Sequence, residues 1–186
     1  MNKYIIGAIL SIAIIGFMSV EKAQALDCGD TISVDTTLTK NLGPCPGDGL
    51  IIDTNDVTLD LNNKKIRGSG VCPAPDCFTG AFIQVGNGVT VLPGVTGVTI
   101  KNGTIQDSFR RGIDIRAGCH GTHVHNVTVK DDMVFGIHVD SSDDVVVKDS
   151  RILNMAGNSL EVFFGSNFTL ENNVMNTAGK ARQIQA

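Results

Sequence analysis

Four stretches decide the fold: VTIKNGTI at residues 98–105, HVHNVTV at 123–129, VVVKDSRI at 145–152 and FTLENNVM at 168–175. Each carries an Asn or Asp at the same place, and these residues follow one another at steps of 24, 23 and 23: Asn102, Asn126, Asp149 and Asn172. Three shorter stretches keep the same period: GIDI at 112–115, GIHV at 136–139 and SLEV at 159–162. A constant period of this length indicates a repeat architecture.

Each stretch alternates apolar with polar residues and is rich in Val, Ile and Thr, which is typical of half-buried strands. Gly, Asn, Asp and Ser separate the strands and leave no room for a crossover helix. Short strands that return at a fixed period imply a coil, in which each strand stacks in parallel on its equivalent in the previous turn. We therefore predict an all-β chain, a parallel β-helix with two or three strands in each rung of 23–24 residues.

The segments DCGDTI at 27–32, LGPCPGDGL at 42–50 and VTLDLN at 57–62 resemble the start of secreted right-handed parallel β-helix proteins of the pectin-lyase-like superfold. That superfold holds polysaccharide lyases and hydrolases, alginate epimerases and an accessory protein of nitrous-oxide reductase maturation. The resemblance implies a right-handed coil over residues 50–186 and an N-terminal cap over 26–49. Turn and core residues carry it, so it implies a fold rather than an activity.

The first 25 residues are predicted to be a secretory signal peptide. A positive start at Lys3 precedes an apolar run over 4–18, and the segment ends in small residues around Ala25. The apolar run is short for a spanning helix, which needs about 20 residues. We expect cleavage after Ala25, no membrane span afterwards, and a secreted, periplasmic or cell-surface protein. An uncleaved membrane anchor is the alternative.

Five cysteines suit an exported protein, in which disulfides form. Neighbours in sequence are the expected pairs, Cys28 with Cys45 and Cys72 with Cys77. The first pair would tie the predicted cap, and the second would staple a loop that leaves the coil. Cys119 is then unpaired and is expected to be a small buried residue.

Composition narrows the class of function. The chain has 186 residues, a net charge of −4 and no basic run. One domain, or a small two-domain chain at most, is expected, and nucleic-acid binding is not. A solenoid needs a cap on its open end, and the last residues show no apolar cap segment. We therefore expect a truncated product or a short member of its kind, with end-to-end self-association.

The most suggestive chemistry lies in the column Asp114, His138 and Glu161, at the outward position between two inward apolar columns. Strand spacing puts neighbouring members roughly 5 Å apart on one exposed sheet face. A histidine between two carboxylates could supply the general acid and base that glycosidic bond cleavage needs. The flanking Arg111, Arg116 and Asp140 would bind a uronate carboxylate or a metal. The alternative is alternating charge on a solvated strand, worth a few tenths of a kcal/mol per pair.

Several features bear on catalysis and on metals. No Trp or Tyr follows residue 25, which excludes a tyrosine acid and leaves sugar stacking to Phe109, Phe135 or Phe163. GCHG at 118–121 only approaches the Gly-His-Gly signature of polygalacturonases, and their paired aspartates are missing too. A metal site at His120, His123 and His125 is disfavoured, because His125 would stack between Lys101 and Lys148. The aspartate pairs at 131–132 and 143–144 are interpreted as turn residues, with calcium binding as the alternative. No cofactor is expected.

The Asn and Asp column at 102, 126, 149 and 172 is expected to be structural, with side-chain amides hydrogen-bonded along the stack. Our leading interpretation is a secreted protein that recognises or processes an extracellular polysaccharide on one sheet face, as a lyase or glycoside hydrolase if it is an enzyme. The alternatives are a non-enzymatic structural or accessory scaffold and a fragment of a longer enzyme.

Overall fold

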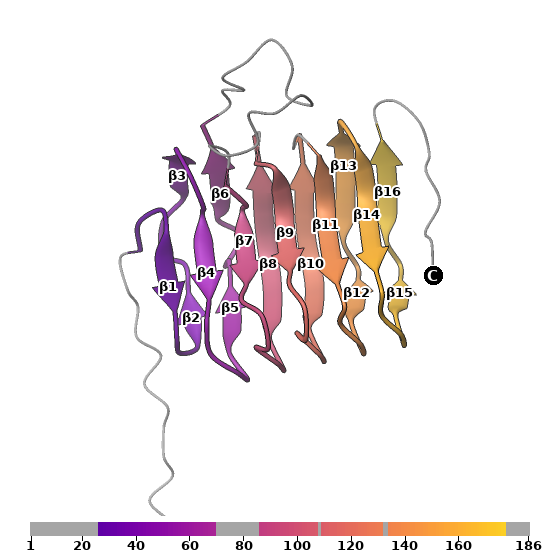
Figure 1. The fold of residues 1–186 in the computed structure, drawn as a ribbon. Coiled ribbons are helices and arrows are strands. Elements are labelled where there is room, and N and C mark those ends of the chain that lie inside the picture. Colours follow the sequence, from indigo (N-terminus) through magenta and orange to yellow (C-terminus); the bar gives the residue numbers. More distant parts are fainter. Residues whose placement is uncertain (1–25, 70–85, 108, 132–133, 178–186) are drawn as a thin grey trace, which may run out of the picture.

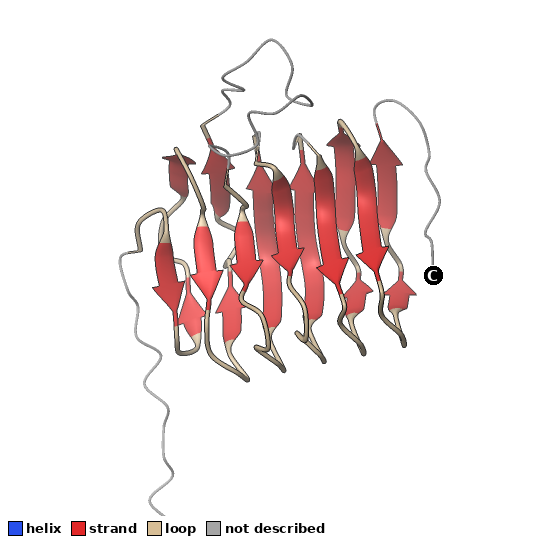
Figure 2. Cartoon of the chain, in the orientation of Figure 1, coloured by secondary structure: helices blue, strands red, loops and turns tan. Residues whose placement is uncertain are grey.

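The computed structural model describes residues 26–69, 86–107, 109–131 and 134–177. These residues form short strands joined by turns and contain no helix (Figure 2). Accordingly, no helix among them is long and apolar enough to cross a membrane. The predicted signal peptide over 1–25 and the predicted Cys72–Cys77 pair lie outside the described residues.

Two parallel sheets face each other (Figure 1). The six-stranded sheet has the order β1 (Asp30–Ile32), β4 (Leu50–Ile52), β7 (Val89–Val91), β9 (Arg111–Ile115), β11 (Phe135–Asp140) and β14 (Asn158–Phe163). The main path of the ten-stranded sheet is β2 (Thr36–Thr37), β5 (Thr58–Asp60), β8 (Thr99–Gln106), β10 (His123–Lys130), β12 (Val146–Lys148) and β15 (Thr169–Glu171). Its other strands are β3 (Leu42–Cys45), β6 (Lys65–Gly68), β13 (Arg151–Met155) and β16 (Val174–Thr177).

The predicted stacking is confirmed by the register of the strands. Val124 pairs with Ile100 on one side and with Val147 on the other, and Ile137 pairs with Ile113 and Leu160. Equivalent residues of successive rungs therefore lie side by side. Their apolar side chains point inward and form one continuous buried core between the sheets, where each contributes about 1.5–3 kcal/mol by leaving water.

The corners of the coil explain the many Gly, Asn and Asp residues. Each rung turns at backbone positions with positive φ, which Gly, Asn and Asp adopt most readily. These positions stack in columns: Gly94, Gly118, Ser141 and Phe164; Gly97, Gly121, Asp144 and Asn167; Asn102, Asn126, Asp149 and Asn172; and Asp107, Asp131 and Asn154. The predicted amide ladder is confirmed at two of its steps, from Asn126 Nδ2 to Asn102 Oδ1 (3.0 Å) and from Asn172 Nδ2 to Asp149 Oδ1 (3.2 Å).

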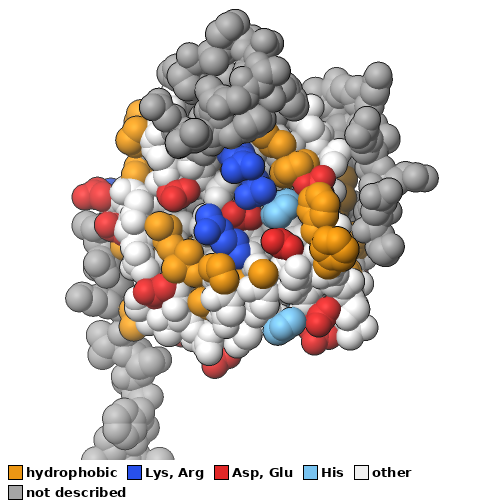
Figure 3. Space-filling model, viewed as in Figure 1, with side chains coloured by type: hydrophobic (Ala, Val, Ile, Leu, Met, Phe, Trp, Pro, Cys, Tyr) orange, Lys and Arg blue, Asp and Glu red, His pale blue; other side chains and the backbone are white. Residues whose placement is uncertain are grey.

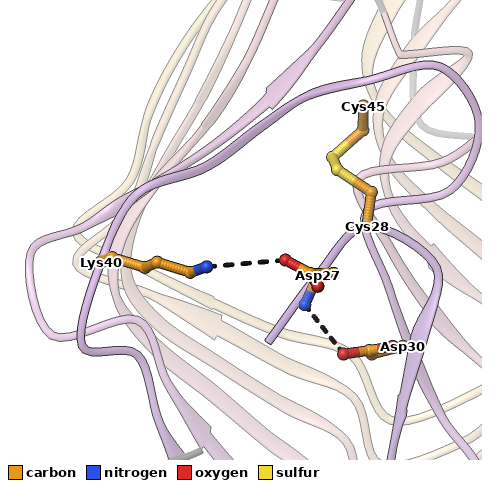
Figure 4. Close-up of a disulfide and its surroundings, with 5 residues drawn as sticks. All are labelled: Asp27, Cys28, Asp30, Lys40 and Cys45. Carbon is orange, nitrogen blue, oxygen red and sulfur yellow. Dashed lines mark hydrogen bonds and ion pairs between the residues drawn. A yellow bond between two sulfur atoms is a disulfide. The ribbon is translucent and has the colours of Figure 1, made fainter. Parts of the chain in front are cut away.

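Residues 26–49, predicted to cap the coil, form its first rung, because β1, β2 and β3 pair in parallel with β4, β5 and β6. The predicted Cys28–Cys45 disulfide is present, with the two Cα atoms 5.4 Å apart (Figure 4). Beside it, Lys40 Nζ lies 3.5 Å from Asp27 Oδ1. Cys119 is free and buried, as predicted, and burial raises the pKa of its thiol.

Candidate functional site

The outward column predicted from the repeat is formed on the six-stranded sheet. Asp114 of β9, His138 of β11 and Glu161 of β14 pair in register, and the same row continues through Thr90 of β7 to Ile51 of β4. Figure 3 shows basic, acidic and histidine side chains gathered near the centre of this face, with hydrophobic side chains beside them. The sequence prediction that these three residues meet is confirmed.

The prediction that this row is solvent-exposed is wrong. Asp114 is only 1% exposed and His138 only 7%, although both point away from the core. Long side chains from neighbouring positions contact and surround them: Asn87, Arg111, Arg116, Phe135 and Phe163. The estimate of a few tenths of a kcal/mol for solvated pairs therefore does not apply, since buried charges cost several kcal/mol unless they are paired.

Asp114 is held by four contacts. Its Oδ1 lies 3.0 Å from His138 Nδ1, and its Oδ2 accepts hydrogen bonds from Asn87 Nδ2 (3.0 Å), Arg111 Nη1 (3.2 Å) and Arg116 Nε (3.3 Å). Burial by itself raises the pKa of this carboxyl. The hydrogen bond from His138 and the charges of both arginines and His138 outweigh it, so the pKa lies below its ordinary value. Asp114 is therefore an ionised acceptor at neutral pH.

His138 is fixed in orientation by these neighbours. An ionised Asp114 only accepts hydrogen bonds, so Nδ1 of His138 carries the proton between them. The ring stacks on Phe135, with centroids 5.6 Å apart, and contacts Phe163 at 5.8 Å. Its other nitrogen, Nε2, faces Glu161, with 4.0 Å between Nε2 and Oε2.

Glu161 has the opposite character to Asp114. Its Oε1 accepts a hydrogen bond from Asn158 Nδ2 (3.3 Å), while its Oε2 is buried without a hydrogen-bond partner. Burial raises the pKa of Glu161 and outweighs the lowering by His138, Asn158 and Arg111. The row thus holds two carboxyl groups whose pKa values are pushed apart, a pattern that assigns the acid and base roles in many enzymes.

Unpartnered polar atoms gather in this cluster. Among the described residues, the buried atoms without a hydrogen bond include Asn87 Oδ1, Arg111 Nε and Glu161 Oε2. A buried group of this kind costs about 1–3 kcal/mol and calls for an explanation. A bound molecule with its own donors and acceptors would supply the missing partners.

Two of the three predicted binding residues contact the cluster and the third does not. Arg111 and Arg116 both reach the cluster through Asp114, and the side chain of Arg116 is 45% exposed. Asp140 does not join them: its carboxylate accepts a hydrogen bond from Ser141 Oγ (2.8 Å), and no hydrogen bond or ion pair among the described residues links it to Asp114, His138 or Glu161. The reason is that the side chain lies at the end of β11, beyond the row.

Asn87 and Asn158 are the residues that sequence reasoning missed. Asn158 is the first residue of β14 and lies three residues before Glu161. Arg111 has the same place on β9, three residues before Asp114. The same spacing relates Asn87 to Thr90, but the step from β4 to β7 is longer than one repeat. Because of that longer step, the position of Asn87 in the repeat could not be assigned from the sequence. Asn158 could have been predicted from its spacing to Glu161.

The remaining histidines lie elsewhere. His125 pairs in register with Lys101 and Lys148, as predicted, and its Nε2 is 3.2 Å from Asp149 Oδ2. His120 Nδ1 accepts a hydrogen bond from the backbone of Asp143 (3.0 Å). Within the described ranges, no group of three or more His, Cys, Asp or Glu side chains is arranged to hold a metal ion.

Asp143 has the turn role that was inferred for it. Its Oδ1 accepts hydrogen bonds from the backbone N–H and the hydroxyl of Ser166 in the next rung (2.7 and 2.8 Å). These bonds lower the pKa of Asp143 below its ordinary value.

The fold and the row of stacked side chains define the class: a parallel β-solenoid with a charged cluster on one outer face. The sequence profile of the family described as "Right handed beta helix region" matches residues 25–184, and the chain belongs to this family. No curated protein and no solved structure matches the chain significantly.

Proposed function

We propose that the face around Asp114, His138 and Glu161 binds an acidic polysaccharide outside the cytoplasm and cleaves it by β-elimination. The observation that carries this proposal is the pairing of His138 Nε2 with Glu161 Oε2 at 4.0 Å, beside an ionised Asp114. The fold by itself does not require a buried charge cluster on its outer face, and buried charges are costly unless they are paired and hydrogen-bonded.

The pairing of an imidazole with a carboxyl group, rather than of two free carboxyl groups, favours elimination over hydrolysis. An inverting hydrolase leaves about 6.5–9.5 Å between its carboxyl groups to hold a water molecule. A retaining enzyme needs two carboxylates close together, and Asp114 is buried behind its four contacts. Groups 4.0 Å apart suit two proton transfers on one sugar ring.

The proposed step balances without a co-reactant. His138 Nε2 takes the proton from C5 of a uronate, the electrons form the C4–C5 double bond, the C4–O4 bond breaks, and O4 takes the proton of Glu161. The proton on His138 then returns to Glu161. Asp114 is a positioning residue here, because it holds Nδ1–H and stabilises the imidazolium. Arg116 would neutralise the sugar carboxylate, and the half-exposed Phe163 offers a ring face for stacking.

The test is incubation of the purified chain with uronate-containing and neutral polysaccharides. Ultraviolet absorbance follows the new double bond, and a separate assay follows reducing ends. We expect unsaturated products from the acidic polysaccharides only, and a loss of about 10²–10⁴-fold in rate for Glu161→Gln and for His138→Gln. The matched controls are Glu171→Gln and His123→Gln, at exposed residues of the other sheet, and should keep the wild-type rate.

Reducing ends without unsaturated products would contradict elimination and show that the reaction is hydrolysis. Equal rates for the wild type and Glu161→Gln would remove the assignment of Glu161.

A scaffold without catalysis is the second candidate. The observation that favours it is that Asp114 joins three neighbouring rungs, through Asn87, Arg116 and His138, which is also what a structural clasp would do. A scaffold would bind the polysaccharide, or nothing in the panel, without any product. Binding measured by titration calorimetry, together with the absence of both kinds of product, would establish this alternative.

A further inference from the structure

Exposed apolar side chains are concentrated at one end of the coil. Among the described residues, one large exposed hydrophobic side chain, Val34, belongs to the first rung. The others all lie in the last rung, which is formed by β14, β15 and β16 at the yellow end of Figure 1: Phe163, Phe164, Leu170, Val174 and Met175. We call the side of β14, β15 and β16 that faces away from the rest of the coil the C-terminal edge.

The core is open at this edge. Leu170 continues the inward column of Val124 and Val147, and Met175 pairs with Ile152 in another inward column. These column neighbours are fully buried, whereas Leu170 is 40% and Met175 37% exposed. At the other end, the first-rung residues Ile32, Leu38 and Leu42 are all buried. One end of the core is therefore covered and the other is not.

The backbone of the edge is also unpaired within the described chain. β14 and β15 end their sheets, and β16 pairs only with β13. Thr169 donates to Val145, and the carbonyl of Glu171 accepts from Asp149, so both bond back to the previous rung. Alternate residues of a strand direct their backbone groups to opposite sides, so Leu170 directs its N–H and C=O to the free side. Such an edge is a template for further strand pairing.

We propose that a second copy of this chain docks on the C-terminal edge, with edge against edge around a two-fold axis. A partner that satisfies this surface must present strands from two sheets with an open apolar layer between them, and the same edge of another copy does so. Two-fold symmetry makes a surface complementary to itself. The buried core of the first rung disfavours head-to-tail stacking, which would set a covered end against an open one.

This assembly has a consequence for the outer face, although it does not depend on the proposed function. Glu161 lies on β14, the strand at the edge of the six-stranded sheet. Pairing of two β14 strands would join the two sheets and bring the two charged rows next to the dimer axis. The outer face available to a long ligand would double in length.

The experiment is sedimentation equilibrium of the purified chain from low micromolar concentration upward. We expect a reversible monomer–dimer equilibrium that stops at twice the chain mass. The double variant Leu170→Lys/Met175→Lys should weaken the dimer by at least about a hundredfold, since each buried ammonium group costs more than the 1.4 kcal/mol of one tenfold step. Val34→Lys is the matched control, with the same change at an exposed apolar residue of the other end, and should dimerise as the wild type does.

A second variant covers the case in which the double variant does not fold, as judged by circular dichroism. Leu170→Pro removes an N–H that points to the free side, so it costs the monomer no hydrogen bond of its own, and it should abolish pairing. A wild-type monomer at all concentrations would overturn the proposal and leave the edge to another occupant, such as residues 178–186. Mass that grows without limit, or a dimer lost in Val34→Lys, would overturn it in favour of head-to-tail stacking.

Discussion

Replacement of Asp114 by Asn tests whether the buried cluster on the outer face is held together by charge. The substitution keeps the size of the side chain but removes the negative charge that faces Arg111, Arg116 and His138. It also puts an amide N–H₂ where one oxygen now accepts hydrogen bonds. Removal of one partner from a buried ion pair costs about 3–5 kcal/mol, and we expect a loss in that range for Asp114→Asn.

The assay is urea denaturation, with the free energy of unfolding taken from the midpoint at an unchanged slope. Asp140→Asn is the matched control: among the described residues its carboxylate accepts a hydrogen bond only from the neighbouring Ser141, and the change should stay within about 0.5 kcal/mol. A loss below about 1 kcal/mol for Asp114→Asn would refute the argument that the cluster is a tightly paired network.

The same prediction has a pH dependence with a definite sign. Because the pKa of Asp114 is lowered on folding, its contribution to stability is present above the unfolded pKa of about 3.9 and is lost as the pH falls through the folded value. The difference between the wild type and Asp114→Asn should therefore shrink as the pH falls below about 4. A difference that does not change in acid would show that packing, and not charge, produces it.

Three further outcomes are expected. The pKa of Glu161 is raised on folding, so its ionisation opposes folding once the pH exceeds its unfolded pKa. Glu161→Gln should then be more stable than the wild type at pH 7, with the gain vanishing below about pH 4, as pH-dependent thermal melts would show. Gly136→Ala should lower the free energy of unfolding, measured by urea denaturation, by about 1–3 kcal/mol. The added Cβ would overlap the backbone of the next strand and a side chain of the opposite sheet. Gly47→Ala, where a Cβ meets nothing within 4 Å, should be neutral, and equal effects of the two would contradict the close approach of the sheets. Replacement of Cys28 and Cys45 by Ser should lower the stability by about 3 kcal/mol, as expected for a closed loop of this length; a variant with an unchanged midpoint would show that the bond is not needed at this end.

The variants of Asp114 and Glu161 together test whether the candidate site is functional or only structural. A network that is only structural predicts a large loss of stability for Asp114→Asn and no catalytic effect of Glu161→Gln. Both interpretations predict that Glu161→Gln stabilises the fold at pH 7, because the pKa of Glu161 is raised on folding. A functional site predicts in addition that the substitution removes activity. The rate of Glu161→Gln therefore separates the two interpretations, and the stability of the same variant shows that it is folded.

The repeat alone was enough to predict the coil, the inward columns and the meeting of Asp114, His138 and Glu161. The physical reason is that parallel pairing at a fixed period leaves one register in which every apolar residue faces the core. The amide ladder followed from the same phase, whereas the burial of Cys119 was expected because it is the cysteine left without a neighbour to pair with. Where the period breaks, as between residues 61 and 89, the phase of Asn87 was lost.

Only the tertiary structure decided how the outer face is covered and what each carboxyl group does. The alternation of side chains along the strand predicts that Asp114 points outward. It does not predict that Arg111, Arg116 and Phe163 contact the row and bury it. The opposite shifts of the Asp114 and Glu161 pKa values depend on burial and on the distances to His138 and Arg111, which come from different rungs.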